Sequence, residues 1–414
     1  MTITRLSKRV RQVSVSPIQT IMNRTSELRA QGRNIIELSV GQADFDTAEN
    51  IEQAAIQSIR EGHTRYTAFD GISSLKDAII TKFQRDNGLE YTPEQIIVSV
   101  GSIQSLFTLV LALLDDDDEA ILIAPYWSPY LENIRFAGGK SVIVKTSMES
   151  GFKICAEQLE NTITDKTKLL ILNSPSNPTG QAYTRSELEA LSQVLRRYPH
   201  VHILTDDIYE HILWAPEPFA NIVMVAPDLA ERTIILNGVS KCYAMTGWRI
   251  GYAAGPPEII HAMKKVQSQN TASPPSISQY AALEALVGDQ SSTNEMVQVF
   301  KQRHDYVVEA LNAIDGVCCL PSDGTFYAFP SFKEAINQLD GVDDDITLSL
   351  YLLEQAGVAL VPGSGFGMSG YLRLSYAASL VQLREAMQRI VLALREIKKN
   401  KSDKISHGAD ESSS

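Results

Sequence analysis

The chain contains few cysteines and no long apolar run. Its four cysteines are Cys155, Cys242, Cys318 and Cys319, and no C-x-x-C pair occurs among its 414 residues. Cysteines this sparse and irregular predict reduced thiols, with neither a disulfide framework nor a zinc site. No stretch reaches the ~18 consecutive apolar residues of a membrane-spanning helix. The basic N-terminus has no apolar segment behind it, so we expect no secretory signal and a cytoplasmic protein.

Positive charge is also scarce. The formal net charge is −12, from 37 Lys and Arg against 49 Asp and Glu. Such an acidic balance keeps a protein soluble and argues against a nucleic-acid or membrane-surface partner. The hydrophobic fraction of 44% is ordinary for a globular protein. The length exceeds that of one compact core, so we expect two domains.

Short apolar runs alternate with longer amphipathic ones along the first two thirds of the chain. The short runs are rich in Ile, Val and Leu, as in strands of a sheet that is covered on both faces. One amphipathic run opens with Thr184 and has Glu187 three residues later, which is a capping box. The alternation predicts an α/β domain with a mainly parallel sheet. The predicted strands are 96–100, 120–124, 141–145, 168–172, 202–205, 233–236 and 250–254.

From about residue 290 the pattern changes to long helices around short strands, such as 357–361 and 372–375. This pattern predicts a smaller α+β domain. The polar end of the chain predicts disorder. The expected division is an N-terminal segment, 1–45, packing with the small domain and the active-site entrance; a large domain, 46–289; a small domain, 290–398; and a disordered tail, 399–414.

Lys241 is the first candidate for chemistry. It follows the predicted strand 233–236 and a short turn. Burial at a strand end lowers the pKa of a lysine and makes its amine nucleophilic, as a Schiff-base lysine requires. Arg249 lies eight residues further on and could clamp a phosphate. Taken alone, such a lysine is more often a surface residue.

Two further motifs follow predicted strands. The loop N-S-P-S-N-P-T-G, 173–180, would present Asn177 at the carboxyl end of a strand, where open α/β sheets bind ligands. An ordinary turn is the alternative. In T-D-D-I-Y, Asp206 at a buried strand end needs a cationic partner, and a protonated pyridine nitrogen would serve. Tyr209 could reach the hydroxyl group of the same ring.

Three weaker signals complete the set. Gly101 lies between a predicted strand and a helix, where backbone N–H groups can hold a phosphate. Trp127 could stack on a planar ring or fill the core. Arg373 lies in an alternating strand, where it either faces solvent or clamps a carboxylate, and periodicity does not decide between these.

In their order and spacing, the motifs S-P-S-N-P-T-G, T-D-D-I-Y, S-K-C-Y-A-M-T-G-W-R-I-G-Y and R-L-S-Y resemble those of the class I aminotransferases of fold type I. The match is nearest to the bacterial aspartate aminotransferase subgroup Ib and runs from about residue 6 to about residue 397. It implies a large domain whose mainly parallel mixed sheet lies between helices, and a smaller α+β domain. It also implies pyridoxal 5′-phosphate as cofactor, no metal, and a homodimer with shared active sites.

The resemblance implies a role for each matching residue. Lys241 would carry the cofactor and move the substrate Cα proton, and Asp206 would pair with the pyridine nitrogen. Tyr209 and Asn177 would bond the ring oxygen, and Trp127 would stack on the ring. The phosphate would be bound by Gly101, Ser102, Ile103, Ser240 and Arg249, and by Tyr66 of the partner subunit. The substrate would be bound by Gly41, Trp127, Asn177, Arg373, Ile18 and Ile103, with Arg373 holding the α-carboxylate.

Two regions depart from the pattern of aspartate-using relatives. Those relatives place a lysine near the distal carboxylate of the substrate, and here that position is Ile103. A second lysine and small hydroxyl residues in the N-terminal segment align with Ser14, Pro17 and Ile18. An acidic side chain would meet apolar groups, and an unpaired buried charge costs ~1–3 kcal/mol or more. The sequence therefore predicts a preference for neutral or apolar amino acids, with aspartate as the alternative.

Three functions are compatible with this set of residues. A transaminase would move an amino group from an L-amino acid to a 2-oxo acid with ping-pong kinetics. A C–S β-lyase of the same fold would release pyruvate and ammonia without such exchange. A cofactor-sensing regulator would carry a DNA-binding module, yet only about 40 residues precede Gly41 and the chain is acidic. We expect the transaminase.

Overall fold

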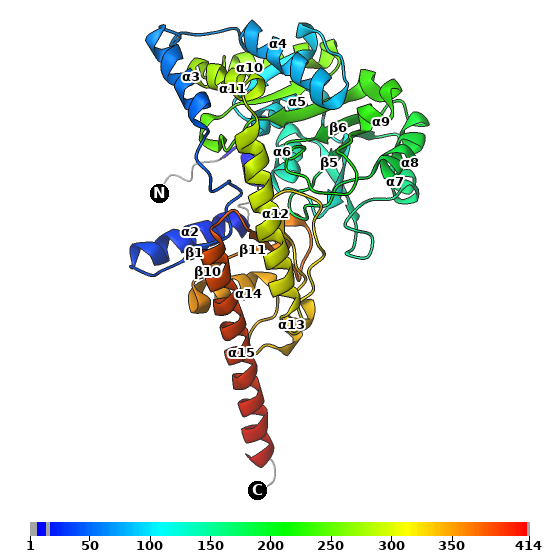
Figure 1. Ribbon diagram of the computed structural model, residues 1–414. Coiled ribbons are helices and arrows are strands. Elements are labelled where there is room, and N and C mark those ends of the chain that lie inside the picture. Colours follow the sequence, from blue (N-terminus) through cyan, green and yellow to red (C-terminus); the bar gives the residue numbers. More distant parts are fainter. Residues whose placement is uncertain (1–5, 14–16, 412–414) are drawn as a thin grey trace.

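The computed structural model describes residues 6–13 and 17–411 (Figure 1). A seven-stranded sheet forms the larger part, and α12 (Ser291–Asn312) runs from it into the C-terminal part. Among the described residues, no helix combines the length and apolarity that crossing a bilayer requires. All four cysteines are free thiols, as expected.

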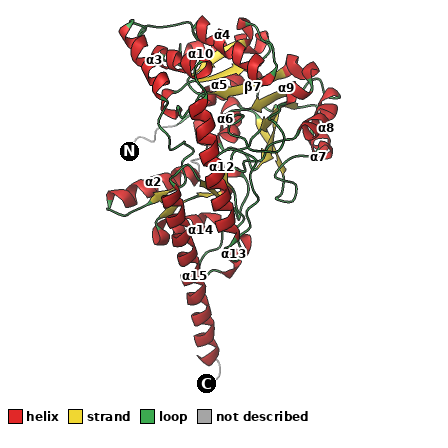
Figure 2. Ribbon diagram, viewed as in Figure 1, coloured by secondary structure: helices red, strands yellow, loops and turns green. Residues whose placement is uncertain are grey.

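The large sheet, whose strands are yellow in Figure 2, is mainly parallel, as predicted. Strand β8 alone runs against its two neighbours. The strands, in spatial order, are β2 (Ile96–Ser99), β8 (Gly251–Ala254), β7 (Thr233–Gly238), β6 (His202–Asp206), β5 (Thr167–Asn173), β3 (Glu119–Ala124) and β4 (Lys140–Lys145). Each of the seven predicted runs became one of these strands.

Successive side chains of a strand point to opposite faces of the sheet, so the apolar runs supply two cores. Ile203 packs in one hydrophobic cluster, and its neighbour Leu204 packs in the other. The first cluster includes residues of α4 (Ser73–Lys82), α8 (Arg185–Arg196) and α11 (Ser276–Val287). The second includes residues of α5 (Ser102–Leu113), α6 (Pro129–Ala137) and α10 (Pro257–Asn270). Burial on both faces explains why the strands read as continuous apolar runs.

Helix α8 shows how local sequence sets an element boundary. The Thr184 side chain accepts a hydrogen bond from the Glu187 backbone at 3.2 Å, and Glu187 accepts one from the Thr184 backbone at 2.7 Å. This is the predicted capping box, and a cap of this kind contributes ~1 kcal/mol.

The C-terminal part contains two small sheets. Strand β12 (Leu372–Ser375) lies between β11 (Val361–Pro362) and β9 (Tyr327–Ala328), antiparallel to both. Strand β1 (Ile36–Glu37) pairs in parallel with β10 (Val358–Ala359). The remaining helices are α1 (Lys8–Gln12), α2 (Pro17–Ala30), α3 (Glu49–Arg60), α7 (Ala156–Thr162), α9 (Ile222–Val225), α13 (Lys333–Gln338), α14 (Asp345–Tyr351) and α15 (Leu380–Glu411).

Three details differ from expectation. The predicted strand 357–361 is interrupted between β10 and β11, which pair with different partners. Within the first 45 residues, α2 and β1 contact C-terminal elements, whereas α1 contacts α6 beside the large sheet. Helix α15 continues to Glu411 through most of the predicted disordered tail (Figure 1). The segment 399–407 contains no proline or glycine, so nothing in its backbone stops the helix.

Candidate active site

One cavity gathers most of the predicted site residues at the carboxyl ends of β5, β6 and β7. It encloses about 1160 Å³, including its open mouth. The predicted residues that line it are Ile18, Gly41, Ser102, Ile103, Trp127, Asn177, Asp206, Tyr209, Ser240, Lys241, Arg249 and Arg373. Ile18 and Met22 bring α2 to this cavity. The N-terminal segment therefore contributes directly to the site.

Lys241 lies on the turn after β7, as the sequence predicted. Its Nζ donates a hydrogen bond to the Gly41 carbonyl oxygen at 2.7 Å. Burial lowers the pKa of this amine to about 8, and the charges of Arg373 and Arg249 act in the same direction. A lysine in this state supplies a neutral, nucleophilic amine near physiological pH.

Asp206 is the last residue of β6 and is buried. Its Oδ2 accepts a hydrogen bond from the Tyr130 hydroxyl at 2.6 Å, and its Oδ1 accepts one from the Ile208 backbone at 3.3 Å. Burial raises the pKa of Asp206 despite both hydrogen bonds. A cation placed against this carboxylate would stabilise its ionised form, so the position fits a protonated ring nitrogen.

The residues at the start of α5 form a cradle that could hold a phosphate. A Cβ on Gly101 would collide with the Arg249 guanidinium, and one on Gly251 would collide with the Ser102 backbone nitrogen. Both positions therefore require glycine. Arg249 itself adopts a left-handed backbone conformation, with φ 58°, and its Nη1 donates to the Thr246 carbonyl oxygen at 2.8 Å. The arginine and the N–H groups of a helix N-terminus together suit a phosphate.

Arg373 is buried between two aromatic rings. Its guanidinium carbon lies 4.6 Å from the Tyr327 ring centre and 5.0 Å from that of Phe366. Its Nη1 donates to Asn177 Oδ1 at 3.0 Å, and its Nη2 donates to the Ser39 carbonyl oxygen at 2.6 Å. Its Nε is buried without a hydrogen-bond partner. Arg373 thus faces the cavity and not solvent, and a buried guanidinium with a spare donor fits a carboxylate ligand.

Two tyrosines of the site, Tyr327 and Tyr130, were not predicted from the sequence. The Tyr327 and Tyr209 hydroxyl groups lie 2.9 Å apart, and burial raises the pKa of both. A Cβ on Gly41 would collide with the Tyr327 hydroxyl, so this close approach requires the glycine. The other missed residue is Tyr130, whose ring meets that of Trp127 edge-on at 5.4 Å. Its place in the first turn of α6, three residues after Trp127, was the available signal.

The remaining predicted residues concern substrate selection and the partner subunit. Ile103 is 38% exposed, and both Ile103 and Ile18 line the cavity. Of the residues aligned with relatives, Ser14 lies outside the described part of the chain. Tyr66 does not line this cavity and is 92% exposed, so its predicted role in a partner's site stays a prediction.

Comparisons with known proteins identify the family of the chain. The family model "Aminotransferase class I and II" matches residues 33–390. An aspartate/prephenate aminotransferase of Nitrosomonas europaea is 50% identical, over 94% of this chain and 100% of its own. A crystal structure of an aspartate aminotransferase from Rhizobium meliloti has a TM-score of 0.92 at 44% identity, covering 94% of this chain and 99% of its own. The structure of a Thermus thermophilus aspartate aminotransferase with maleate has a TM-score of 0.87 at 40% identity. It covers 94% of this chain and 100% of its own.

Proposed function

The chain belongs to the class I and II aminotransferase family and is a pyridoxal-phosphate-dependent aminotransferase, and we propose that its amino donor is aspartate and its acceptor a 2-oxo acid. The main support is the identity of 45–50% to relatives named aspartate/prephenate or aspartate aminotransferases. These relatives align over more than nine tenths of this chain. They favour aspartate over the neutral amino acids that the apolar positions predicted.

The cavity fits the cofactor at three points. We assign its phosphate to the cradle of Gly101, Ser102 and Arg249, its ring nitrogen to Asp206, and its covalent attachment to Lys241. When bound, pyridoxal 5′-phosphate supplies a conjugated ring that takes up the electron pair left at the substrate Cα. The other residues that we assign to cofactor binding are Ile103, Trp127, Asn177, Tyr209, Ser240 and the partner's Tyr66.

The proposed mechanism divides the work between three residues. Arg373 binds the substrate α-carboxylate and so places the Cα hydrogen toward Lys241. The Lys241 amine, which the substrate amine would displace from the cofactor, takes the proton from Cα and would deliver it to the cofactor carbon that had held Lys241, a transfer that contributes ~10²–10⁴-fold. Asp206 stays ionised and would stabilise the positive charge of the protonated ring nitrogen of the cofactor. Because donor and acceptor use the same site in turn, the kinetics are ping-pong.

A second candidate is a preference for neutral or apolar amino acids. It is favoured by Ile18 and Ile103, which place apolar groups on the cavity wall. Among the residues that the structure describes, the cations lining the cavity are Lys241, Arg249 and Arg373, and each already has a proposed role in binding the cofactor or the α-carboxylate. Of the described groups, neutral ones such as Gln42 are then left to bind the distal carboxylate of aspartate, or the partner subunit binds it.

Single-turnover spectroscopy distinguishes the two candidates. The purified holoenzyme is mixed with one amino acid at a time, and the fall in visible absorbance is followed. Aspartate should bleach the spectrum fastest, and a 2-oxo acid should restore it. Faster bleaching by leucine or phenylalanine would instead support the neutral donor. Release of pyruvate and ammonia without recovery of the spectrum would indicate the lyase.

We also propose that the enzyme is a homodimer. The Tyr66 side chain is almost fully exposed, and Phe69 in the same loop is also exposed, although both are large and apolar. A partner subunit would cover them and would receive Tyr66 at its phosphate cradle. Sedimentation should give twice the chain mass, and Tyr66→Phe should weaken cofactor binding without dissociating the dimer.

A further inference from the structure

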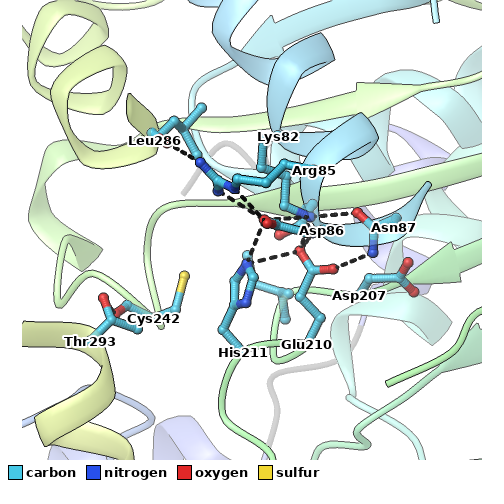
Figure 3. Close-up of polar contacts among 12 residues, drawn as sticks. Lys82, Arg85, Asp86, Asn87, Asp207, Glu210, His211, Cys242, Leu286 and Thr293 are labelled. Carbon is cyan, nitrogen blue, oxygen red and sulfur yellow. Dashed lines mark hydrogen bonds and ion pairs between the residues drawn. The ribbon is translucent and has the colours of Figure 1, made fainter. Parts of the chain in front are cut away.

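A group of buried polar side chains lies between α4 and the ends of β6 and β7 (Figure 3). It consists of Lys82, Asn87, Glu210 and Asn237, here called the Glu210 cluster. Figure 3 shows Lys82, Asn87 and Glu210 turned toward one another, with Asp86 and His211 at the edge of the group. None of the four lines the active-site cavity, and the proposed mechanism uses none of them.

The Glu210 carboxylate is bonded on both oxygens. Its Oε1 accepts from Lys82 Nζ and, at 2.6 Å, from Asn237 Nδ2. Its Oε2 accepts from Asn87 Nδ2 at 2.8 Å. The side chains of Lys82 and Glu210 are 1% and 3% exposed. Burial by itself raises the pKa of Glu210, but the charges of Lys82 and His211 and the Asn87 bond outweigh it, so the net pKa is lowered.

The cluster connects the two segments that carry the groups facing the cofactor. Glu210 directly follows Tyr209, on the turn after Asp206. Asn237 stands in β7, four residues before Lys241, and its Oδ1 accepts from the Gly238 backbone at 2.7 Å. A displacement of the Glu210 carboxylate would therefore shift both the segment that carries Tyr209 and the segment that carries Lys241.

The hydrogen bond between Glu210 and Asn237 lies just beyond the last backbone hydrogen bond between β6 and β7. The Cα pairing of β6 with β7 ends at Asp206 and Leu236, and one more backbone bond joins Asp207 to Leu236 at 2.9 Å. Beyond that point the segment after β6 turns away and carries Tyr209, whereas β7 continues to Gly238, paired with β8, before the turn that carries Lys241. The bond between Glu210 and Asn237 continues the connection where the backbone ladder has stopped.

The stability of the fold does not by itself explain the buried ion pair of Lys82 and Glu210. A buried ion pair replaced by apolar residues of similar volume is often neutral or stabilising. We propose that Glu210 is a positioning residue, which through Asn237 sets the Lys241 amine relative to Tyr209 and Asp206, while Lys82 and Asn87 hold its carboxylate in place. The inference rests on the proposed role of Lys241.

The test separates positioning from stability. In the double variant Lys82→Met with Glu210→Leu, both charges are removed together, so no buried charge is left unpaired. We expect the double variant to stay folded with a modestly lower unfolding temperature, because the buried Asn87 and Asn237 amides lose their acceptor. Well below that temperature, kcat should still fall ~10–100-fold, as for a misplaced catalytic group. KM should stay close to the wild-type value. The pH midpoint of the visible absorbance should shift, and the apo-enzyme should take up pyridoxal phosphate more slowly.

Two single variants refine this result. Asn237→Ala removes the bond between β7 and the turn after β6 but leaves the pair of Lys82 and Glu210, so it should lower kcat in the same way. Glu210→Gln keeps an oxygen that can accept from Asn237, so it should retain more kcat than the double variant. If the double variant does not fold, Asn237→Ala carries the test.

Lys76→Met is the matched control. Lys76 lies on the same helix, is also buried, and pairs with Asp70 at 3.0 Å, and Asp70 keeps Lys264 as a partner at 3.0 Å. This variant should leave kcat and the spectral midpoint unchanged. Folded Asn237→Ala and double variants with wild-type kcat and midpoint would overturn the proposal. All assays use the donor that the wild type uses best, so a poor rate with aspartate would refute the donor assignment alone.

Discussion

The hydroxyl group of Tyr130 donates a hydrogen bond to Asp206 Oδ2 at 2.6 Å, although the two residues are 76 positions apart. Tyr130 comes from α6 and Asp206 from the end of β6. Both are buried, so the bond is made in a low-dielectric environment, where a hydrogen bond to a charged group is strong.

Tyr130→Phe should therefore weaken the binding of pyridoxal phosphate. The Tyr130 bond lowers the pKa of Asp206 against the effect of burial, and its loss moves that pKa further up. A carboxyl group that is more often protonated pairs less well with the ring nitrogen. A bond to a charged group contributes ~1.5–3 kcal/mol, so kcat/KM should fall ~10–100-fold. Steady-state rates and cofactor titration check this, and a variant equal to the wild type in both would contradict it.

The Lys241 amine predicts a particular pH dependence. Burial lowers its pKa to about 8, so the neutral fraction grows as the pH rises through 8. Uptake of pyridoxal phosphate by the apo-enzyme should accelerate from pH 6 to 8 and level off above pH ~9, where the amine is already neutral. A lysine with its ordinary pKa would keep accelerating to pH ~10.4. Stopped-flow absorbance across this range distinguishes the two profiles, and Lys241→Ala should give no visible band.

Arg373→Lys should impair substrate binding more than cofactor binding. The planar guanidinium makes two separate bonds, to Asn177 and to the Ser39 backbone, and keeps a free Nε. Lysine keeps the charge but cannot reproduce this fork. We expect kcat/KM to fall ~100-fold, while the visible absorbance of the resting enzyme is retained. Arg389→Lys, on α15 and outside the cavity, is the control; equal effects of both changes would contradict the assignment.

Much of the fold could be predicted because the large sheet is buried on both faces. Apart from the edge strand β4, which is largely exposed or half-buried, its strands are buried apolar runs with polar or glycine-containing ends. These runs are visible without any structure. The same strand ends are followed by Asn177 and Lys241 or carry Asp206, so position marked these residues as candidates, and the resemblance of the motifs implied their roles. The strands β9, β10 and β11 have only two residues each and leave no such pattern.

The contacts that the sequence did not reveal join residues far apart in the chain. Tyr327 reaches Tyr209 across 118 positions, and Lys82 reaches Glu210 across 128. A lysine at the end of an amphipathic helix usually faces solvent, so nothing in the local pattern marks Lys82 as buried. Such contacts follow from tertiary packing and not from periodicity.

Ile103→Lys addresses the remaining question of substrate choice. Ile103 is the second residue of α5, lines the cavity and is 38% exposed, so a longer side chain can extend into the cavity without displacing the core. A lysine there would add a cation to a wall that now presents Ile18 and Ile103. If aspartate is bound without a cation at this place, the added charge should raise kcat/KM for aspartate ~10-fold and lower it for leucine. Ile103→Met, which is similar in length but uncharged, is the control. An unchanged ratio of the two rates would mean that the distal carboxylate does not approach Ile103, and that another group in the dimer binds it.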